Sequence, residues 1–235
     1  GPSNIIELVS KIYKSLRGYT SINEVDRLKK DKSSIPIMVH ASINSIESLD
    51  KIWGNKLRYI NCCRHPLDAY NHTLNSFKSL HNNPAWFTLY IEIELSNGIV
   101  LKLPWFLKEV PMTLFPNRIP SDIEITLMAL GFYSKKIVEK SKKYMHKSNI
   151  LLFDFDTLIK KPKESVENLF YDFLDLDKTT KLKLKYNYYN LPRKQDEIQL
   201  KRQLIIKDLK NMNIHEPIRE YFNEALFEYE SNFSH

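Results

Sequence analysis

Short apolar runs alternate with helical patterns along this sequence, and the alternation constrains the fold more than any other feature. Three runs are short and apolar enough to form buried strands: 36–41, 56–63 and 150–155. Apolar residues recur at helical spacing in neighbouring segments: 45–53, 66 to about 80, and 163–175. Strands that alternate with helices are typical of α/β folds built on a parallel sheet. We therefore expect an α/β protein.

The segment 87–104 departs from this alternation. It contains two strand-like runs on either side of Asn97-Gly98. Both residues of that pair tolerate positive φ, which a two-residue hairpin turn requires. We therefore expect a β-hairpin near 87–104 that is inserted into the α/β framework or appended to it.

The remaining segments predict helices and one long polar connection. Helical patterns begin at residue 4 and recur at 122–147 and around 215–230, whereas 181–199 is polar and predicts a loop. The sequence contains no internal repeat, low-complexity tract or clear linker. The simplest organisation is a single domain that spans 1–235.

Composition and charge narrow the class of protein. The chain has 235 residues and a formal net charge of +7, which favours anionic partners. Its lysines are scattered rather than gathered in one stripe with aromatic residues, so nucleic acid is the less favoured anion. Neither an apolar run of roughly 20 residues nor a secretory signal is visible, so we expect a cytoplasmic protein without a membrane segment. Cys62 and Cys63 are adjacent in a predicted strand and point to opposite faces, which predicts reduced thiols rather than a disulfide or zinc site.

Arg64-His65-Pro66-Leu67-Asp68 forms the junction between the second apolar run and the helical pattern after it. A residue at the end of a buried parallel strand lies at the edge where α/β sheets bind ligands. A helix N-terminus offers free N–H groups and partial positive charge, and a guanidinium binds phosphate through two parallel hydrogen bonds. Arg64 is therefore a candidate anion-binding residue, and Asp68 is better suited to hold Arg64 or backbone donors. The alternative is a surface arginine at a turn.

Three motifs occur in a particular order along the chain. The first apolar run ends in His40, the second leads into residues 64–68, and the third forms the segment 150–158. Lys161-Pro162 follow the third run, and the next helix closes on 173–176. In order and spacing they resemble the sulfotransferase family that uses 3′-phosphoadenosine 5′-phosphosulfate. That family follows an apolar strand with Arg-Asn/His-Pro-x-Asp, ends a later strand in Tyr-Glu-Asp-Leu, and closes the next helix on Phe-Leu-Gly-Leu. The resemblance implies a P-loop-like fold, in which helices and a central parallel sheet form a three-layer sandwich.

The resemblance also implies which positions bind the donor. Arg64 would bind the 3′-phosphate, and His72 stands where the family usually has a serine that shares this phosphate. Phe155 stands where the family often has a tyrosine near the adenine, and a phenyl ring retains the stacking. Arg193 and Lys194 match a late Arg-Lys-Gly segment that closes over the 3′-phosphate, with glutamine in place of the glycine.

His40 matches the family's catalytic base, which takes the proton from the acceptor hydroxyl as its oxygen attacks sulfur in line. Imidazole suits this role because its pKa lies near neutral pH. The lysine that often lies just before this base is replaced by Met38-Val39. Without the resemblance, a lone histidine at a strand end is more often structural.

The family's phosphosulfate loop, a turn of the Pro-Lys/Arg-Ser-Gly-Thr-Thr type, should precede the first helix. Here Gly1-Pro2-Ser3-Asn4 precede it, either as the end of that loop or as the remnant of a cleaved tag. In the first case, Ser3 would cap the helix and donate to the anion. Lys14-Ser15 does not replace the loop, because it lies within the helical pattern. We therefore expect most of the loop to be missing, together with its lysine or arginine.

The leading hypothesis is a sulfotransferase that moves a sulfuryl group from 3′-phosphoadenosine 5′-phosphosulfate to a hydroxyl or amine acceptor without a metal. A carbohydrate is one candidate acceptor. The second hypothesis is a non-catalytic relative that keeps the nucleotide pocket. The third is a basic nucleic-acid-binding protein, whose affinity would fall steeply with salt. The acceptor stays open, because variable loops build acceptor pockets in such folds.

Overall fold

The structure is a computed structural model of the chain. It describes residues 43, 46–54, 58–82, 90–95, 97–175 and 195–233. All of these belong to one compact unit, residues 42–235. The helix expected from residue 4, the strand expected at 36–41 and most of the loop expected at 181–199 lie outside the described residues. The single domain over 1–235 stays a prediction.

Two of the predicted strands pair in parallel. They are β1, Tyr59–Cys63, and β4, Ile150–Asp154. Their register runs from Tyr59 opposite Ile150 to Cys63 opposite Asp154. Because parallel strands require a crossover connection, the pairing joins segments that helices separate in the chain. The α/β class is therefore confirmed.

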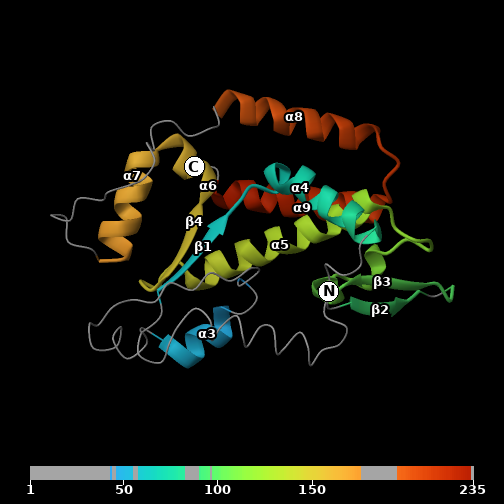
Figure 1. Ribbon diagram of the computed structural model, residues 1–235, viewed down its shortest axis with the longest axis horizontal. Helices are drawn as coiled ribbons and strands as arrows, with labels where there is room; N and C mark the ends of the chain where they lie inside the picture. Colours follow the sequence, from blue (N-terminus) through green and yellow to red (C-terminus); the bar gives the residue numbers. More distant parts are fainter. Residues whose placement is uncertain are drawn as a thin grey trace. The chain divides into compact units, whose positions relative to one another are not determined.

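Helices connect the strands and pack around them (Figure 1). The α-helices are α3 (Ile46–Trp53), α4 (Pro66–Asn82), α5 (Asp122–Tyr144), α6 (Phe155–Lys160), α7 (Pro162–Glu167), α8 (Gln195–Asn211) and α9 (Glu216–Phe233). Short 3₁₀ helices η4 (Trp105–Glu109) and η5 (Met112–Leu114) precede α5, and a π-helix, η6 (Asn168–Phe173), follows α7. The helices predicted at 45–53, 66–80, 122–147 and 215–230 are confirmed, with small changes at their ends.

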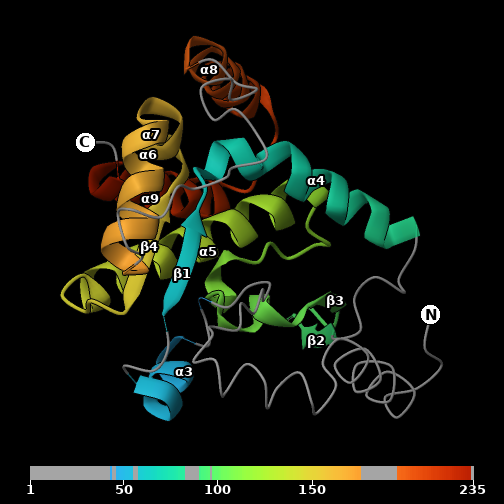
Figure 2. The ribbon, with the colours of Figure 1, turned by 60° about the vertical axis from the view of Figure 1, so that its left-hand side comes forward.

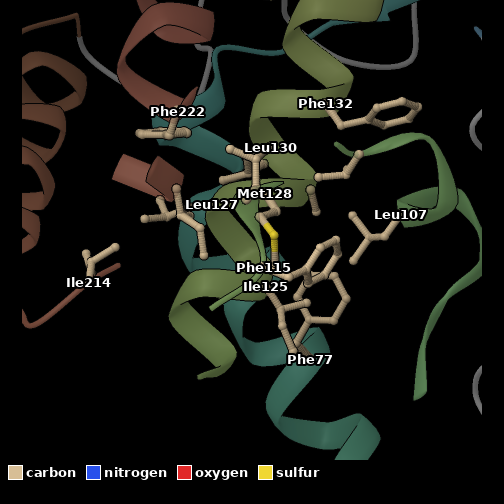
Figure 3. Packing of buried hydrophobic residues seen from close by; sticks show 14 of the residues in the cluster. Phe77, Leu107, Phe115, Ile125, Leu127, Met128, Leu130, Phe132, Ile214 and Phe222 are labelled. Atoms are coloured by element: carbon tan, nitrogen blue, oxygen red, sulfur yellow. The ribbon is translucent and has the colours of Figure 1, made fainter. Parts of the chain in front are cut away.

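The largest core cluster packs α5 against α4, α9 and the hairpin (Figure 3). Leu127 and Met128 of α5 are completely or almost completely buried in it, and Phe222 of α9 packs there as well. Gly131 permits a close approach of the two helices, since a Cβ at this position would lie 2.7 Å from the ring of Tyr221. This core fixes α4, the helix that follows the end of β1, against α5 and α9.

The predicted hairpin is confirmed. Strands β2, Tyr90–Glu94, and β3, Val100–Pro104, pair antiparallel around Asn97-Gly98. Gly98 has φ of 79°, a conformation that costs glycine little. The Asn97 amide donates to the carbonyl of Asn117 at 2.8 Å, so the turn is tied to the chain that leads into α5.

Two helix predictions need correction. The polar segment predicted as a loop to residue 199 begins helix α8 at Gln195. Tertiary contacts decide this, because α8 buries one narrow face that carries Ile198, Arg202, Ile205 and Leu209. The single helix predicted at 163–175 instead changes from α to π geometry after Glu167. The short helix α6 was not predicted from the sequence.

The structure also bears on the expectations about a membrane segment and about the two cysteines. Within the described ranges, no helix is long and apolar enough to cross a membrane. Cys62 is exposed and Cys63 is buried, and both are free thiols, as the strand alternation predicts. Burial raises the pKa of Cys63 to about 12, so this thiol stays protonated.

Candidate functional site at the ends of β1 and β4

The parallel pair brings two predicted site residues to one edge of the sheet. Cys63 is opposite Asp154 in the register, and each is the last residue of its strand. Arg64 follows the first strand and Phe155 follows the second, so both lie just beyond the same carboxyl edge. Arg64 is exposed, and Phe155 is half-buried as the first residue of α6. In α/β proteins this edge is where ligands bind.

His65 caps the helix that follows Arg64. Its Nδ1 accepts a hydrogen bond from the Leu67 N–H at 3.3 Å, and its carbonyl accepts from the N–H groups of Asp68 and Ala69 at 3.0 and 3.2 Å. Pro66 has no N–H, so the first donors of α4 already have partners. The expectation of free N–H groups at this helix end is therefore wrong. An anion here must rely on Arg64 and the helix dipole.

The hydrogen bonds of His65 also define its protonation. Because Nδ1 is an acceptor, Nε2 carries the proton and donates to Oε1 of Glu230 in α9 at 3.2 Å. Burial and the charge of Arg202 lower the pKa of His65. Its ring also meets Tyr229 edge-on, with centroids 5.6 Å apart. His65 is a neutral structural residue at neutral pH.

Asp68 lies in the first turn of α4 and pairs with an arginine from α8. Arg202 Nε donates to Asp68 Oδ1 at 3.1 Å, and Nη2 donates to Oδ2 at 2.7 Å. The same Nη2 donates to Oδ1 of Asp156 in α6 at 2.8 Å. Asp68 therefore holds Arg202, rather than Arg64 as the sequence suggested. We call Asp68, Arg202 and Asp156 the carboxylate–guanidinium bridge.

The bridge shifts the protonation of Asp68 and Arg202 toward their charged forms. Burial alone would raise the pKa of Asp68, but the hydrogen bonds and charge of Arg202 outweigh it and lower that pKa. Burial alone would lower the pKa of Arg202, but its hydrogen bonds to Asp68 and Asp156 raise it. Asp68 and Arg202 are therefore both ionised at neutral pH.

A second cap fixes the start of α6 beside Phe155. Asp154 accepts hydrogen bonds from the N–H of Thr157 at 2.9 Å and from its hydroxyl at 2.8 Å. This is the N-cap arrangement that short polar side chains favour. It orients the turn that carries Phe155 directly after the strand.

The structure does not bring all the predicted site residues together in space. His72 is exposed in the second turn of α4, and its carbonyl accepts a hydrogen bond from the Ser76 hydroxyl at 2.9 Å. No described contact links His72 to Arg64. Ser3, His40, Arg193 and Lys194 lie outside the described residues.

A groove of about 550 Å³ is lined by residues of β4, α6, α7 and the π-helix η6. Its lining includes the carboxylates Asp154, Glu164 and Asp172, with Leu169 and Phe173 as apolar walls. Three carboxylates disfavour a multiply charged anion. The groove therefore suits a neutral or cationic group better than a phosphorylated nucleotide.

A comparison of the sequence with models of protein families identifies the family of this chain. The family model described as Sulfotransferase domain matches residues 4–212. The chain belongs to the sulfotransferase family. Members of this family use 3′-phosphoadenosine 5′-phosphosulfate as the sulfuryl donor. No curated protein and no solved structure matches the chain significantly.

The sulfotransferase motifs fall at the junctions described above. Residues 64–68 join β1 to α4, and Phe155 to Leu158 form the start of α6. The Phe-Leu-Gly-Leu pattern of the family corresponds to 173–176, with Asp175 in the glycine position. Asp175 has φ of 57°, a left-handed conformation that favours glycine. The left-handed conformation therefore lies at the position where the pattern in the sequence analysis has glycine.

Sequence reasoning missed Arg202 and Asp156 in this sulfotransferase domain. Arg202 occupies the buried face of α8 together with Ile198, Ile205 and Leu209. An arginine within an apolar helical stripe is a signal for a buried ion pair, because charged side chains are almost never fully buried unless paired. The signal is visible only when 195–211 is a helix, whereas the sequence pattern predicts a loop to 199 and its next helix around 215–230. In the part of the chain that the structure describes, no group of three or more His, Cys, Asp or Glu side chains could hold a metal.

Proposed function

We propose that this protein transfers a sulfuryl group from 3′-phosphoadenosine 5′-phosphosulfate to a hydroxyl or amine acceptor, with a carbohydrate as one candidate. The observation that carries the proposal is the register of β1 and β4. It brings Arg64 and Phe155 to one sheet edge, and a charged group with an aromatic ring suits the phosphate and the adenine of an adenosine 3′-phosphate. Family membership supplies the donor class.

In this proposal the donor lies across the carboxyl edge. Arg64 binds the 3′-phosphate through its exposed guanidinium, and Phe155 stacks against the adenine. His72 donates to the same phosphate from α4, and Arg193 and Lys194 close over it. Ser3 donates to the phosphosulfate end. The groove lined by Asp154, Glu164 and Asp172 does not bind the donor in this proposal.

The transfer needs one base and one leaving group. His40 accepts the proton of the acceptor as its oxygen or nitrogen forms a bond to sulfur. The bond between sulfur and the bridging oxygen of the donor breaks, and that oxygen leaves with the electron pair as part of adenosine 3′,5′-bisphosphate. We expect the strand at 36–41 to join β1 and β4 in the central sheet of a P-loop-like three-layer sandwich. His40 would then lie at the same carboxyl edge as Arg64.

The first test compares two exposed arginines that flank the same strand. Arg58 lies just before β1 and donates to the carbonyl of Ser148 at 3.2 Å, whereas Arg64 lies just after β1. Losing a bidentate charge-assisted contact costs about 1.5–3 kcal/mol. Arg64→Ala should therefore weaken calorimetric binding of adenosine 3′,5′-bisphosphate at least about tenfold, with little change for adenosine 5′-phosphate. Arg58→Ala should leave both affinities near wild type.

Equal affinity of wild type and Arg64→Ala for the bisphosphate would remove Arg64 from the site. Product-nucleotide binding without turnover on hydroxyl and amine acceptors would favour the non-catalytic relative. Binding to arbitrary DNA or RNA with a steep salt dependence, together with no bisphosphate binding, would favour the nucleic-acid hypothesis.

A further inference from the structure

We propose that Arg202 is a positioning residue for the nucleotide site, because it occupies Asp68 and thereby leaves Arg64 free to bind phosphate. The inference rests on the proposed function and adds a residue to the same site. Arg202 lies on α8 and reaches the strand ends through its contacts with α4 and α6. Figure 2 shows α8 beyond the end of β1, toward which the arrow of that strand points.

The contacts of Arg202 are those of a well-formed buried bridge. Only 6% of Arg202 and 3% of Asp68 is exposed to solvent. The two groups form a bidentate pair at 3.1 and 2.7 Å, and Asp156 binds the same guanidinium at 2.8 Å. Such fork-to-carboxylate pairs add geometric specificity as well as energy. The bridge therefore holds α8, α4 and α6 in one arrangement.

The bridge connects the two turns that carry the proposed donor contacts. Asp68 lies four residues after Arg64, and Asp156 directly follows Phe155. A shift of either carboxylate would move the neighbouring contact residue with it. Helix α8 also begins at Gln195, which is covalently joined to Lys194. A single guanidinium on α8 thus connects α4 and α6, the helices that follow the two strand ends.

Arg202 also acts through its charge, which compensates the buried carboxylate of Asp68. Arg64 already lowers the pKa of Asp68 through its charge, so the two groups lie within electrostatic reach. Without Arg202, Asp68 would be a buried carboxylate with no guanidinium to satisfy it, and Arg64, four residues earlier in the chain, would be an arginine able to take that place. An uncompensated buried charge is strongly unfavourable. We expect Arg64 to turn toward Asp68 in that case and to lose its contact with the 3′-phosphate.

The test measures selectivity for the 3′-phosphate rather than stability alone. Calorimetric affinities for adenosine 3′,5′-bisphosphate and adenosine 5′-phosphate are compared in the full chain. Arg202→Met should reduce the preference for the bisphosphate about tenfold or more. The double variant Arg202→Met with Asp68→Asn should recover most of that preference, because a neutral amide does not attract Arg64. A purely structural Arg202 would show no such recovery.

Arg219 provides the matched control. It lies in α9, is partly buried, and donates to the carbonyls of Leu209 and Met212 at 2.7 and 2.9 Å. Arg219→Met should lower the melting temperature without changing the ratio of the two affinities. If Arg202→Met does not fold, Arg202→Lys replaces it, since one ammonium retains the charge but not the bidentate fork. Arg202→Lys should lower the same ratio by severalfold.

The outcomes separate the two proposals. A wild-type protein that fails to bind the bisphosphate overturns both the function and this inference. Wild-type binding that depends on Arg64, together with unchanged selectivity in the folded Arg202 variant, overturns the inference alone. Equal loss of both affinities in Arg202→Met, without recovery in the double variant, also overturns it. Loss of selectivity with recovery in the double variant supports it.

Discussion

Glu124 should be one of the residues on which folding depends most. It lies at the start of α5, and its side chain is fully buried. Its Oε1 accepts from Arg118 Nη2 at 2.7 Å and from the N–H of His215 at 2.8 Å. Its Oε2 accepts from Arg118 Nη1 at 2.7 Å and from the N–H of Ser121 at 2.8 Å. One carboxylate thus joins the cap of α5 to the chain that leads into α9.

Glu124→Gln preserves the shape of this side chain but removes its charge and one acceptor. In either orientation the amide NH₂ faces two N–H donors, so at least two hydrogen bonds are lost. Each charge-assisted bond to this buried carboxylate contributes about 1.5–3 kcal/mol, so the loss of two costs about 3–6 kcal/mol. For a protein of this size that corresponds to a fall in melting temperature of about 6–24 °C.

The assay is thermal unfolding followed by circular dichroism, with Glu139→Gln as the control. Glu139 lies on the same helix but is exposed, and it pairs with Lys136 and Lys140 at 3.4 and 3.1 Å. The exposed pair with Lys136 contributes about 0–1 kcal/mol. Buried Lys140 keeps its ion pair with Glu47 at 2.7 Å, so this control should unfold close to the wild-type temperature. A fall of less than 2 °C for Glu124→Gln, or equal falls for both variants, would refute the reasoning.

The pH dependence gives an independent check on Glu124. Burial alone would raise its pKa, but the hydrogen bonds from Arg118, His215 and Ser121 outweigh burial and lower the pKa to about 2. The folded carboxylate therefore binds a proton less readily than the unfolded one, whose pKa is about 4.3. Its stabilising effect is complete above that value and is lost as the pH falls toward 2. The difference between wild type and Glu124→Gln should shrink over the same interval.

Two further predictions follow from backbone and histidine geometry. Asp175→Gly should raise the free energy of unfolding by about 1 kcal/mol, because φ of 57° is strained for aspartate; denaturant titration measures this, and an unchanged or lower midpoint would contradict it. The pKa of His65 is lowered by burial and by the charge of Arg202, so protons bind the unfolded chain more readily and stability falls as the pH drops below about 6.5. His65→Asn keeps a helix-capping side chain without this titration, so its stability should change less between pH 7 and pH 5. Equal pH profiles for the two proteins would rule out this effect of His65.

Local sequence patterns predicted most of the described elements. The hairpin was predictable because Asn97-Gly98 specifies the turn, and α4 was predictable because Pro66 begins a run of helical spacing. These signals depend only on residues that are neighbours in the chain, so they predict the elements without knowledge of tertiary contacts. The order of the strand-end motifs was also sufficient to indicate the family. Arg64 and Phe155 were identified as candidates on that basis.

Tertiary structure decided what joins these elements. Helix α8 has a polar sequence, and its helical state depends on the narrow face that it buries. Arg202 is separated from Asp68 by 134 residues and from Asp156 by 46 residues. No local pattern specifies which buried carboxylate will meet a distant guanidinium, because that choice depends on how α4, α6 and α8 pack. The sequence by itself therefore determined most of the described elements, the family and the candidate residues at the strand ends, whereas the packing of distant helices determined the helical state of α8 and the bridge that connects α4, α6 and α8.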